Sequence, residues 1–241
     1  MIGNDIVDLS DPESSREACH LRFDRRVFTL EEIEALSTDP TDVQKRWILW
    51  SAKEATYKAA RRECSGVAFS PVRFVVNLDR SLCGLVRYGI RHWPVRVQID
   101  GDCVHAVVSE DESFAGTLSG SCRLTSAELR DPSQSVRRFA IASIATELGV
   151  ATSDLRIEKV DRIPQLILAG EAAPVALSLS HHGSYAGFAC HDPRIEKADR
   201  ARQRIVAAEA APVALSRLRH GLHAALRIDP ALSGRVSIEC R

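Results

Sequence analysis

The sequence predicts an α+β protein built of two similar halves, in each of which a helix is followed by strands. Residues 42–62 repeat small and apolar side chains at helical spacing, and the segments after them are rich in β-branched residues. From residue 135 the same order of a helix and then strands begins again. The repeated order predicts that the two halves are structurally related.

The size and composition are those of a globular protein. With 241 residues, of which 45% are hydrophobic and 27% charged, the chain can bury a core in one domain or in two smaller domains in contact. Its 32 Lys and Arg balance 32 Asp and Glu, so no global charge favours nucleic acid or an anionic membrane. We expect neither nucleic acid nor membrane as a partner, and a monomer is favoured.

The N-terminus and the cysteines indicate the compartment. Residues 1–5 lack the basic start and apolar run of a secretory signal, and no stretch is long and apolar enough to span a bilayer. The seven cysteines are scattered, odd in number and contain no C-x-x-C pair. We therefore expect a cytoplasmic protein, with most thiols packed as small apolar groups.

The first half begins with a strand and continues with helices and further strands. Residues 2–9 form a strand-like run that a turn signal at 11–12 interrupts. Thr29 can cap a helix in which Glu32 completes a capping box, and a longer helix is expected over 42–62. Strands are expected at 72–78, 95–99 and 104–108.

A polar connection separates the halves. Residues 109–134 are dominated by Ser, Gly, Asp and Glu and are predicted to be a connection with a surface loop. After it we expect a helix from Val136 to Leu148, ended by Gly149, and strands at 155–160, 165–168, 175–180 and 185–190. These patterns predict a first half over 1–120, a second half over 121–193 and a C-terminal extension over 194–241 with a helix at 196–210.

The helix over 42–62 carries a core stripe and a pair of opposite charges. The residues expected to face the core recur at helical spacing: Ile48, Ala52, Ala55 and Ala59. Glu54 and Lys58, four residues apart, project together from a flank of this helix. On spacing alone they are a solvated, helix-stabilising ion pair and indicate no function.

Asp5 lies within an apolar run, where a buried carboxylate without a partner would cost several kcal/mol. A cation, a backbone cap or a metal ion could be that partner. An Asp at a strand end often only caps a turn, and Asp8 has the stronger claim to that role. The residues by themselves leave these alternatives open.

A strand that ends in a polar turn, residues 175–186, gathers serines and histidines. Ser178, Ser180 and His181, with amides of the turn, would suit an anion such as phosphate, while a plain hairpin turn is the alternative. His181 and His182 together suggest zinc, but adjacent residues of a strand point to opposite faces. A zinc site is therefore disfavoured.

Three segments together resemble the signature motifs of the 4'-phosphopantetheinyl transferases. They are Gly-Asn-Asp-Ile-Val at 3–7, Trp-Ser-Ala-Lys-Glu-Ala-Thr-Tyr-Lys at 50–58 and Ser-Leu-Ser-His at 178–181. Residues 23–29 and the strand entry at 164–166 are similar to looser features of the family. The resemblance implies the fold of that family, two similar α+β halves related by pseudo-twofold symmetry with one active site between them.

The resemblance also implies a role for each matched residue. Asp5 and Glu54 would hold Mg²⁺, which also binds the pyrophosphate of coenzyme A. The catalytic set would be Asp5, Glu54 and Lys58, and coenzyme A would be bound by Lys58, Ser180, His181 and Arg25. Two hard oxygen ligands with phosphate oxygens and water are what Mg²⁺ prefers.

By the same resemblance the chain is expected to be an enzyme, a 4'-phosphopantetheinyl transferase of the holo-acyl-carrier-protein synthase type. It would move phosphopantetheine from coenzyme A to a serine of an apo acyl or peptidyl carrier protein and release 3',5'-ADP. Glu54 or a metal-bound water would be the base. An acidic carrier of fatty acid, polyketide or peptide synthesis would meet either Arg22, Arg25 and Arg26 or Arg61 and Arg62.

Three features depart from the family's pattern. Val7 stands where longer members carry a second acid, and Arg162 and Ile163 precede the proline where the family usually shows Gly-Lys or Gly-Arg. The motifs follow the order of short members although the chain has the length of two-copy members, which favours two halves in swapped order. The alternatives are a non-catalytic module of the same fold that binds coenzyme A or a carrier, and a Mg²⁺-dependent phosphohydrolase.

Overall fold

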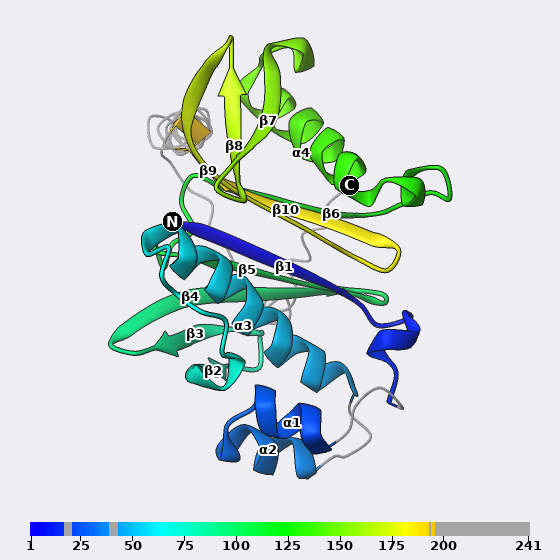
Figure 1. Ribbon diagram of the computed structural model, residues 1–241, viewed down its shortest axis with the longest axis vertical. Helices are drawn as coiled ribbons and strands as arrows, with labels where there is room; N and C mark the ends of the chain where they lie inside the picture. The colour runs from blue at the N-terminus through cyan, green and yellow to red at the C-terminus, as the bar shows by residue number, and fades with distance from the viewer. Residues whose placement is uncertain (17–20, 39–42, 193, 196–241) are drawn as a thin grey trace, which may run out of the picture. The chain divides into compact units, whose positions relative to one another are not determined.

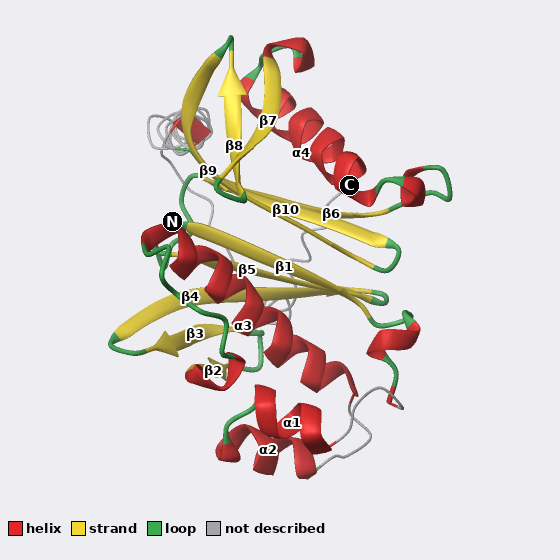
Figure 2. Cartoon of the chain, viewed as in Figure 1, coloured by secondary structure: helices red, strands yellow, loops and turns green. Residues whose placement is uncertain are grey.

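The computed structural model describes residues 1–16, 21–38, 43–192 and 194–195, and residues 1–199 form one compact unit (Figure 1). Within this unit two five-stranded antiparallel sheets each carry a long helix (Figure 2). The extension predicted over 194–241, including its helix at 196–210, lies outside the described residues except for 194–195. The predicted α+β class is confirmed.

The first sheet has the strand order β1-β5-β4-β3-β2. Its strands are β1 (Ile2–Asp8), β2 (Phe74–Leu78), β3 (Cys83–Tyr88), β4 (Arg91–Asp100) and β5 (Cys103–Ser109). The helices of this half are α1 (Leu21–Val27), α2 (Leu30–Ser37) and α3 (Val43–Glu63). The stripe predicted for α3 is confirmed as core, because Ala52, Ala55 and Ala59 are fully buried and Ile48 nearly so.

The second sheet has the strand order β6-β10-β9-β8-β7. Its strands are β6 (Thr117–Arg123), β7 (Leu155–Val160), β8 (Ile163–Leu168), β9 (Glu171–His182) and β10 (Tyr185–His191), and its helix is α4 (Pro132–Leu148). Asp131 caps the start of α4, and Gly149 ends it in the left-handed conformation. In both halves the first strand is followed by a helical segment, three helices in the first half and α4 in the second, and then by four strands, and the first strand pairs with the last. The relation of the halves by a twofold axis stays a prediction.

The prediction of a connection over 109–134 is wrong, because it contains β6. The sequence of β6, TLSGSCR, is small and polar, so its own β-propensity is weak. Pairing with β10 along its whole length forms the strand, and a side chain at Gly120 would lie only 3.3 Å from Phe139 and Phe188. The change of sheet therefore falls between Ser109 and Thr117, and a boundary at 120 would cut β6. β3 and α1 were also not predicted.

Side chains of β9 cover the outer edge of β1. β1 is an edge strand of the first sheet, so one row of its backbone N–H groups has no strand partner. The amides of Asn4, Ile6 and Asp8 donate to Ser178 Oγ at 3.0 Å, Ser180 Oγ at 3.3 Å and His182 Nδ1 at 3.1 Å. These three acceptors lie on every second residue of β9 and therefore on one face of the strand. We call this set of three hydrogen bonds the β1–β9 seam.

Two glycines permit close contacts around β1. A Cβ at Gly3 would lie 2.0 Å from the carbonyl oxygen of Ala55, so only glycine lets α3 lie directly on β1. A Cβ at Gly187 of β10 would lie 2.7 Å from Cδ1 of Ile6. The close approach at Gly3 brings the flank of α3 beside Asp5, and this is a physical reason for the Gly-x-Asp motif.

Lys53, which follows a core residue of α3, is fully buried and ties α3 to α2 and β2. Its Nζ pairs with Glu32 Oε2 at 2.7 Å and donates to the carbonyl oxygens of Pro71 and Phe74. Glu32 also accepts the amides of Thr29 and Val76, and the capping box predicted at Thr29 is confirmed. All three ammonium hydrogens of Lys53 thus have partners inside the first half.

Candidate active site

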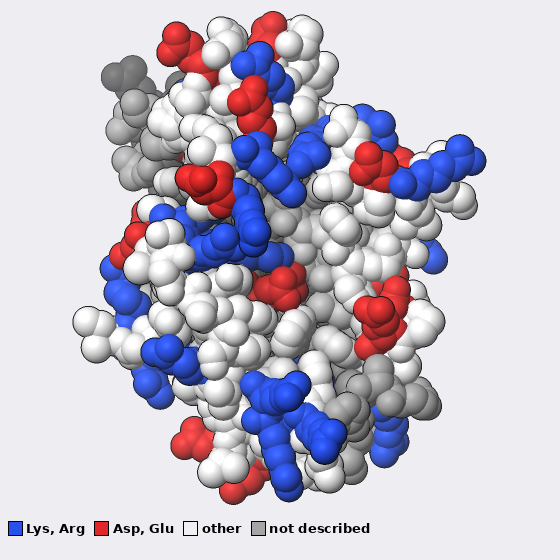
Figure 3. Space-filling view, viewed as in Figure 1, with Lys and Arg blue, Asp and Glu red and all other residues white. Residues whose placement is uncertain are grey.

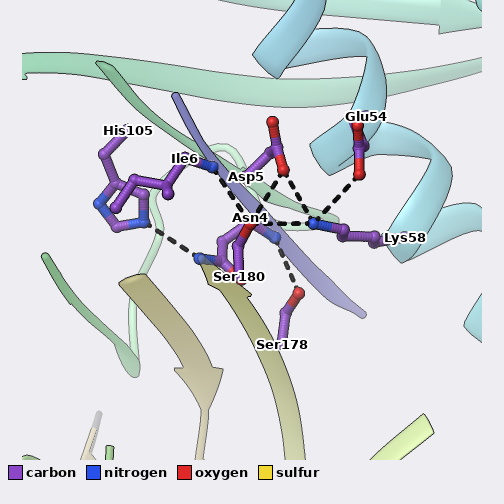
Figure 4. Close-up of polar contacts among 8 residues, drawn as sticks. All are labelled: Asn4, Asp5, Ile6, Glu54, Lys58, His105, Ser178 and Ser180. Atoms are coloured by element: carbon purple, nitrogen blue, oxygen red, sulfur yellow. Dashed lines mark hydrogen bonds and ion pairs between the residues drawn. The ribbon is translucent and has the colours of Figure 1, made fainter. Parts of the chain in front are cut away.

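Asp5, Glu54 and Lys58 meet at the junction of the two sheets (Figure 4). Lys58 Nζ lies 2.9 Å from Asp5 Oδ1 and 3.5 Å from Glu54 Oε1. The two carboxylate oxygens therefore flank one nitrogen, and their separation is at most the sum of these two distances. Asp5 comes from β1 and Glu54 and Lys58 from one flank of α3, so the structure brings the three residues together as the sequence-based prediction requires.

Ser180 of the second sheet completes this cluster. Its hydroxyl donates to Asp5 Oδ1 at 3.0 Å and accepts from Lys58 Nζ at 3.2 Å (Figure 4). Asp5 and Ser180 are 4% and 8% exposed. The cluster thus contains groups from both halves of the chain.

The electrostatics of the cluster show two acids close to one ammonium group. Burial alone would lower the pKa of Lys58, but the neighbouring carboxylates of Asp5 and Glu54 raise it above the ordinary value. Burial, and then repulsion by Asp5, raises the pKa of Glu54, although Lys58 partly opposes this. Repulsion between the two acids favours the binding of a cation beside them.

The residues present fit a divalent cation of the hard type. Asp5 and Glu54 offer carboxylate oxygens to one small volume, and phosphate oxygens and water could complete the coordination. Val7 does not add a ligand, and the carboxylate of Asp8 accepts from the amides of Ser10 and Ser184. The protein would therefore supply two ligands.

A basic cavity of about 200 Å³ adjoins the cluster. Its lining includes Lys58, Arg61 and Arg62 of α3, Arg162 of the turn between β7 and β8, and Ser178 of β9. Arg62 donates to the carbonyl oxygen of Pro164 at 3.4 Å, and burial lowers its pKa to about 10. Figure 3 shows Lys and Arg gathered on the face where the last turns of α3 pass the second sheet. The cavity can accept a polyanion between the two halves.

Of the four residues predicted to bind coenzyme A, only Lys58 lines this cavity. Ser180 lies in the adjoining acid cluster, and His181 and Arg25 lie elsewhere. His181 is exposed, and its side chain leaves β9 on the opposite face from Ser178 and Ser180. Burial lowers the pKa of His181, and Lys58 lowers it further. Arg25 lines a separate pocket on α1 with Arg22, Phe23 and Arg26.

His182, which was considered for zinc, has its Nδ1 engaged by the Asp8 amide. One atom each of His182, Asp11 and Glu13 lie within 4.8 Å of one another. Because Nδ1 accepts a hydrogen bond, the neutral ring carries its proton on Nε2 and has no second lone pair for a metal. In this group of three residues, His182 is therefore better described as a hydrogen-bond donor, through Nε2, beside the carboxylates of Asp11 and Glu13.

The sequence did not predict that Arg62 and Arg162 line this cavity. The sequence suggests Arg62 only for a carrier surface and marks Arg162 only as a departure from a motif. Arg162 and Asp161 both have positive φ, 66° and 50°, so a tight turn directs this part of the chain. Arg162 reaches the cavity because the paired strands β7 and β8 lie next to α3. No pattern among neighbouring residues of the sequence predicts that β7 and β8 lie beside α3.

Asn4 and His105 form a buried polar pair behind Asp5. Asn4 Nδ2 lies 3.3 Å from His105 Nε2, and the residues are 0% and 2% exposed. Since the amide nitrogen can only donate, Nε2 accepts and the ring is neutral. Burial, and then the positive charge of Lys58, lowers the pKa of His105 to about 4.

His105 should make the stability of the protein fall in mild acid. Its pKa is 6.5 in the unfolded chain and about 4 in the folded one, so between these values the unfolded state binds more protons. The stabilisation is complete above pH 6.5 and is lost as the pH falls towards 4, by about 2 kcal/mol at pH 5. Urea unfolding at pH 7.5 and at pH 5 gives the decrease in the free energy of unfolding between these pH values. This decrease should be smaller for His105→Gln than for the wild type. Equal losses would contradict the assignment.

One comparison with known proteins found a match. The family model of the 4'-phosphopantetheinyl transferase superfamily matches residues 1–108, which include Asp5, Glu54 and Lys58. Neither a curated protein nor a solved structure matches the chain. Among the described helices none has the length and apolar character needed to cross a membrane.

Proposed function

We propose that the chain transfers 4'-phosphopantetheine from coenzyme A to a serine of an apo carrier protein, because the family model of the 4'-phosphopantetheinyl transferase superfamily matches residues 1–108. The proposed cofactor is Mg²⁺, and the proposed second product is 3',5'-ADP. We place one active site between the two halves of residues 1–193, with the motif order of the holo-acyl-carrier-protein synthase type.

One observation carries this proposal. Asp5 of β1 and Glu54 of α3 flank the same ammonium group, inside the region that the family model matches. Two far-separated acids that converge at a basic cavity are the arrangement that a cation and a pyrophosphate need together. A fold kept for binding alone would not require both acids to converge.

The chain's own residues would share the work of transfer. When bound at Asp5 and Glu54, Mg²⁺ would neutralise charge on the pyrophosphate. Lys58, Arg62 and Arg162 would bind phosphate oxygens of coenzyme A in the cavity. His181, whose side chain lies outside the cavity, would contact only the nucleotide end of coenzyme A. Lys58 would exchange part of its contact with Asp5 for a phosphate oxygen.

The carrier serine would attack the phosphorus that bears pantetheine. An oxygen–phosphorus bond to serine forms, and the bond from that phosphorus to the oxygen leading to the nucleotide phosphate breaks. The serine proton passes to Glu54 or to a water, and the electron pair leaves with 3',5'-ADP.

The transfer assay separates the proposed enzyme from its alternatives. Purified protein is incubated with Mg²⁺, coenzyme A and each of several apo carriers of fatty acid, polyketide and peptide synthesis, and the carriers are weighed by mass spectrometry. We expect at least one carrier to gain the mass of one phosphopantetheine. Binding without a gain in mass would indicate a non-catalytic module, and release of 3',5'-ADP without a carrier would indicate a phosphohydrolase.

We propose that α1 supplies the carrier-binding surface. Arg25 and Arg26 are exposed on α1, whereas Arg62 is committed to the cavity and to Pro164. Phe23 of the same helix packs on Trp50 of α3, about two turns before Lys58. This position suits the acidic helix of a carrier whose serine reaches the cluster.

Charge reversal on α1 should weaken carrier binding without affecting coenzyme A. For the double variant Arg25→Glu, Arg26→Glu we expect KM for the carrier to rise by about tenfold and to depend less on salt. KM for coenzyme A should stay unchanged. Arg156→Glu on β7, exposed and on the second sheet, is the matched control. If the double variant has the same KM for the carrier as the control variant, α1 is not the docking surface.

A further inference from the structure

The hydroxyl of Ser180 has no hydrogen-bonding capacity left for a substrate. A serine hydroxyl donates one hydrogen bond and accepts two. Ser180 donates to Asp5 Oδ1 at 3.0 Å and accepts from Lys58 Nζ at 3.2 Å and from the Ile6 amide at 3.3 Å. Each of its three hydrogen-bonding positions is thus occupied by a group of the first half.

The contacts of Ser180 restrain Asp5 from two directions. The hydroxyl binds the side chain of Asp5 and also the backbone amide of the next residue, Ile6 (Figure 4). A carboxylate held only through its own rotamers would turn about two bonds, whereas this double contact links its orientation to the strand. The orientation of Asp5 therefore depends on β9.

The β1–β9 seam fixes Ser180 itself. On the same face of β9, Ser178 binds the Asn4 amide and His182 binds the Asp8 amide, one contact on each side. Ser180 is the middle member and the one that also touches the cation-binding acid and the lysine. The second half thus contributes a fixed polar group to the acid cluster of the first.

We propose that Ser180 is a positioning residue for the transfer reaction, which sets Asp5 and Lys58 relative to each other and does not bind coenzyme A. This inference rests on the proposed function. It assigns Ser180 a role other than the phosphate contact that its motif suggests. It also implies that the acid cluster of residues 1–108 is properly arranged only when the second half is docked on β1.

Ser178 provides the matched control on the same strand. It is also buried, 3% exposed against 8% for Ser180, and its Oγ accepts the Asn4 amide at 3.0 Å. Unlike Ser180 it lines the basic cavity, and none of the contacts found in the described residues uses its hydroxyl hydrogen. Ser178→Ala therefore removes one seam hydrogen bond and leaves the contacts of Asp5 and Lys58 in place.

The test compares Ser180→Ala and Ser178→Ala in the full-length chain. We measure kcat and KM for coenzyme A in the transfer assay, and the affinity for Mn²⁺ alone by electron paramagnetic resonance. For Ser180→Ala we expect kcat and Mn²⁺ affinity to fall about 10- to 100-fold, as for other groups that orient a metal ligand, with KM nearly unchanged. For Ser178→Ala we expect Mn²⁺ affinity to be kept and KM for coenzyme A to rise.

Three results would overturn the proposal. If Ser180→Ala had the kcat and the Mn²⁺ affinity of the wild type, the hydroxyl would not be needed to position Asp5 and Lys58. A raised KM with unchanged kcat would make Ser180 a coenzyme A ligand after all. If both variants lost Mn²⁺ affinity equally, the loss would come from weakening the β1–β9 seam as a whole and not from the contacts of Ser180 with Asp5 and Lys58.

Two provisions keep the test decisive. If Ser180→Ala does not fold, Ser180→Cys is measured in its place, because the thiol keeps the size but hydrogen-bonds weakly. If the wild type transfers to none of the carriers, the proposed function fails, and the Mn²⁺ affinities of wild type and variant still judge the positioning role.

Discussion

Glu54→Gln is expected to reduce transfer more than about 100-fold, the largest effect on activity that this structure predicts. Even groups that only orient metal ligands cost 10- to 100-fold when they are lost, and Glu54 is a proposed ligand itself. The change keeps the shape of the side chain and removes its negative charge. The measurement is the rate at which an apo carrier gains phosphopantetheine, together with Mn²⁺ affinity.

The fold should tolerate this substitution. The Glu54 side chain is 29% exposed and pairs with Lys58. The matched control is Glu63→Gln in the last turn of the same helix, where the carboxylate pairs with Arg91 at 2.8 Å. We expect Glu63→Gln to transfer phosphopantetheine at the wild-type rate. We expect both variants to have the free energy of unfolding of the wild type. Rapid transfer by Glu54→Gln would refute the cation site.

Lys53→Ala is expected to lower the free energy of unfolding by about 3–5 kcal/mol, the largest effect on stability. Lys53 is fully buried, and its loss leaves Glu32 without its counter-charge inside the first half. Burial lowers the pKa of Lys53, and only attraction by Glu32 opposes this, so the pair depends on both members. Urea unfolding at neutral pH measures the loss.

Two comparisons separate the charge from the packing. Lys53→Met fills most of the volume without the charge, so any loss of stability it shares with Lys53→Ala belongs to the polar partners left behind, the Glu32 carboxylate and the carbonyl oxygens of Pro71 and Phe74. Lys159→Ala, an exposed lysine of β7, should change stability by less than about 0.5 kcal/mol. If Lys53→Met were as stable as the wild type, Glu32 would not need its partner.

The two lysines of the motif at 50–58 show how much of a function a motif can predict. Lys53 and Lys58 are alike in the sequence, but Lys53 is directed into the first half and Lys58 towards the acids and the cavity. Helical periodicity predicted that Lys58 shares a flank with Glu54. It could not reveal that Lys53 is buried, because that depends on α2 and on the strand that begins at Phe74.

Local patterns predicted what depends on neighbours along the chain. The α+β class, the core stripe of α3, the i, i+4 pair of Glu54 and Lys58 and most strands follow from spacings within one element. β6 escaped prediction because its strand form comes from pairing with β10, whose residues lie far away in the sequence. Propensity is weak information where tertiary pairing decides.

The sequence by itself determined which residues could carry the chemistry: two acids, a lysine and a serine-histidine strand. Tertiary structure alone decided that Asp5 lies beside Lys58, that Arg162 rather than His181 lines the cavity, and that Ser180 faces the acid. The physical reason is that β1 presents an edge whose buried amides require acceptors, and β9 of the other half supplies them. Such contacts join residues more than 170 positions apart, so no spacing along the chain encodes them.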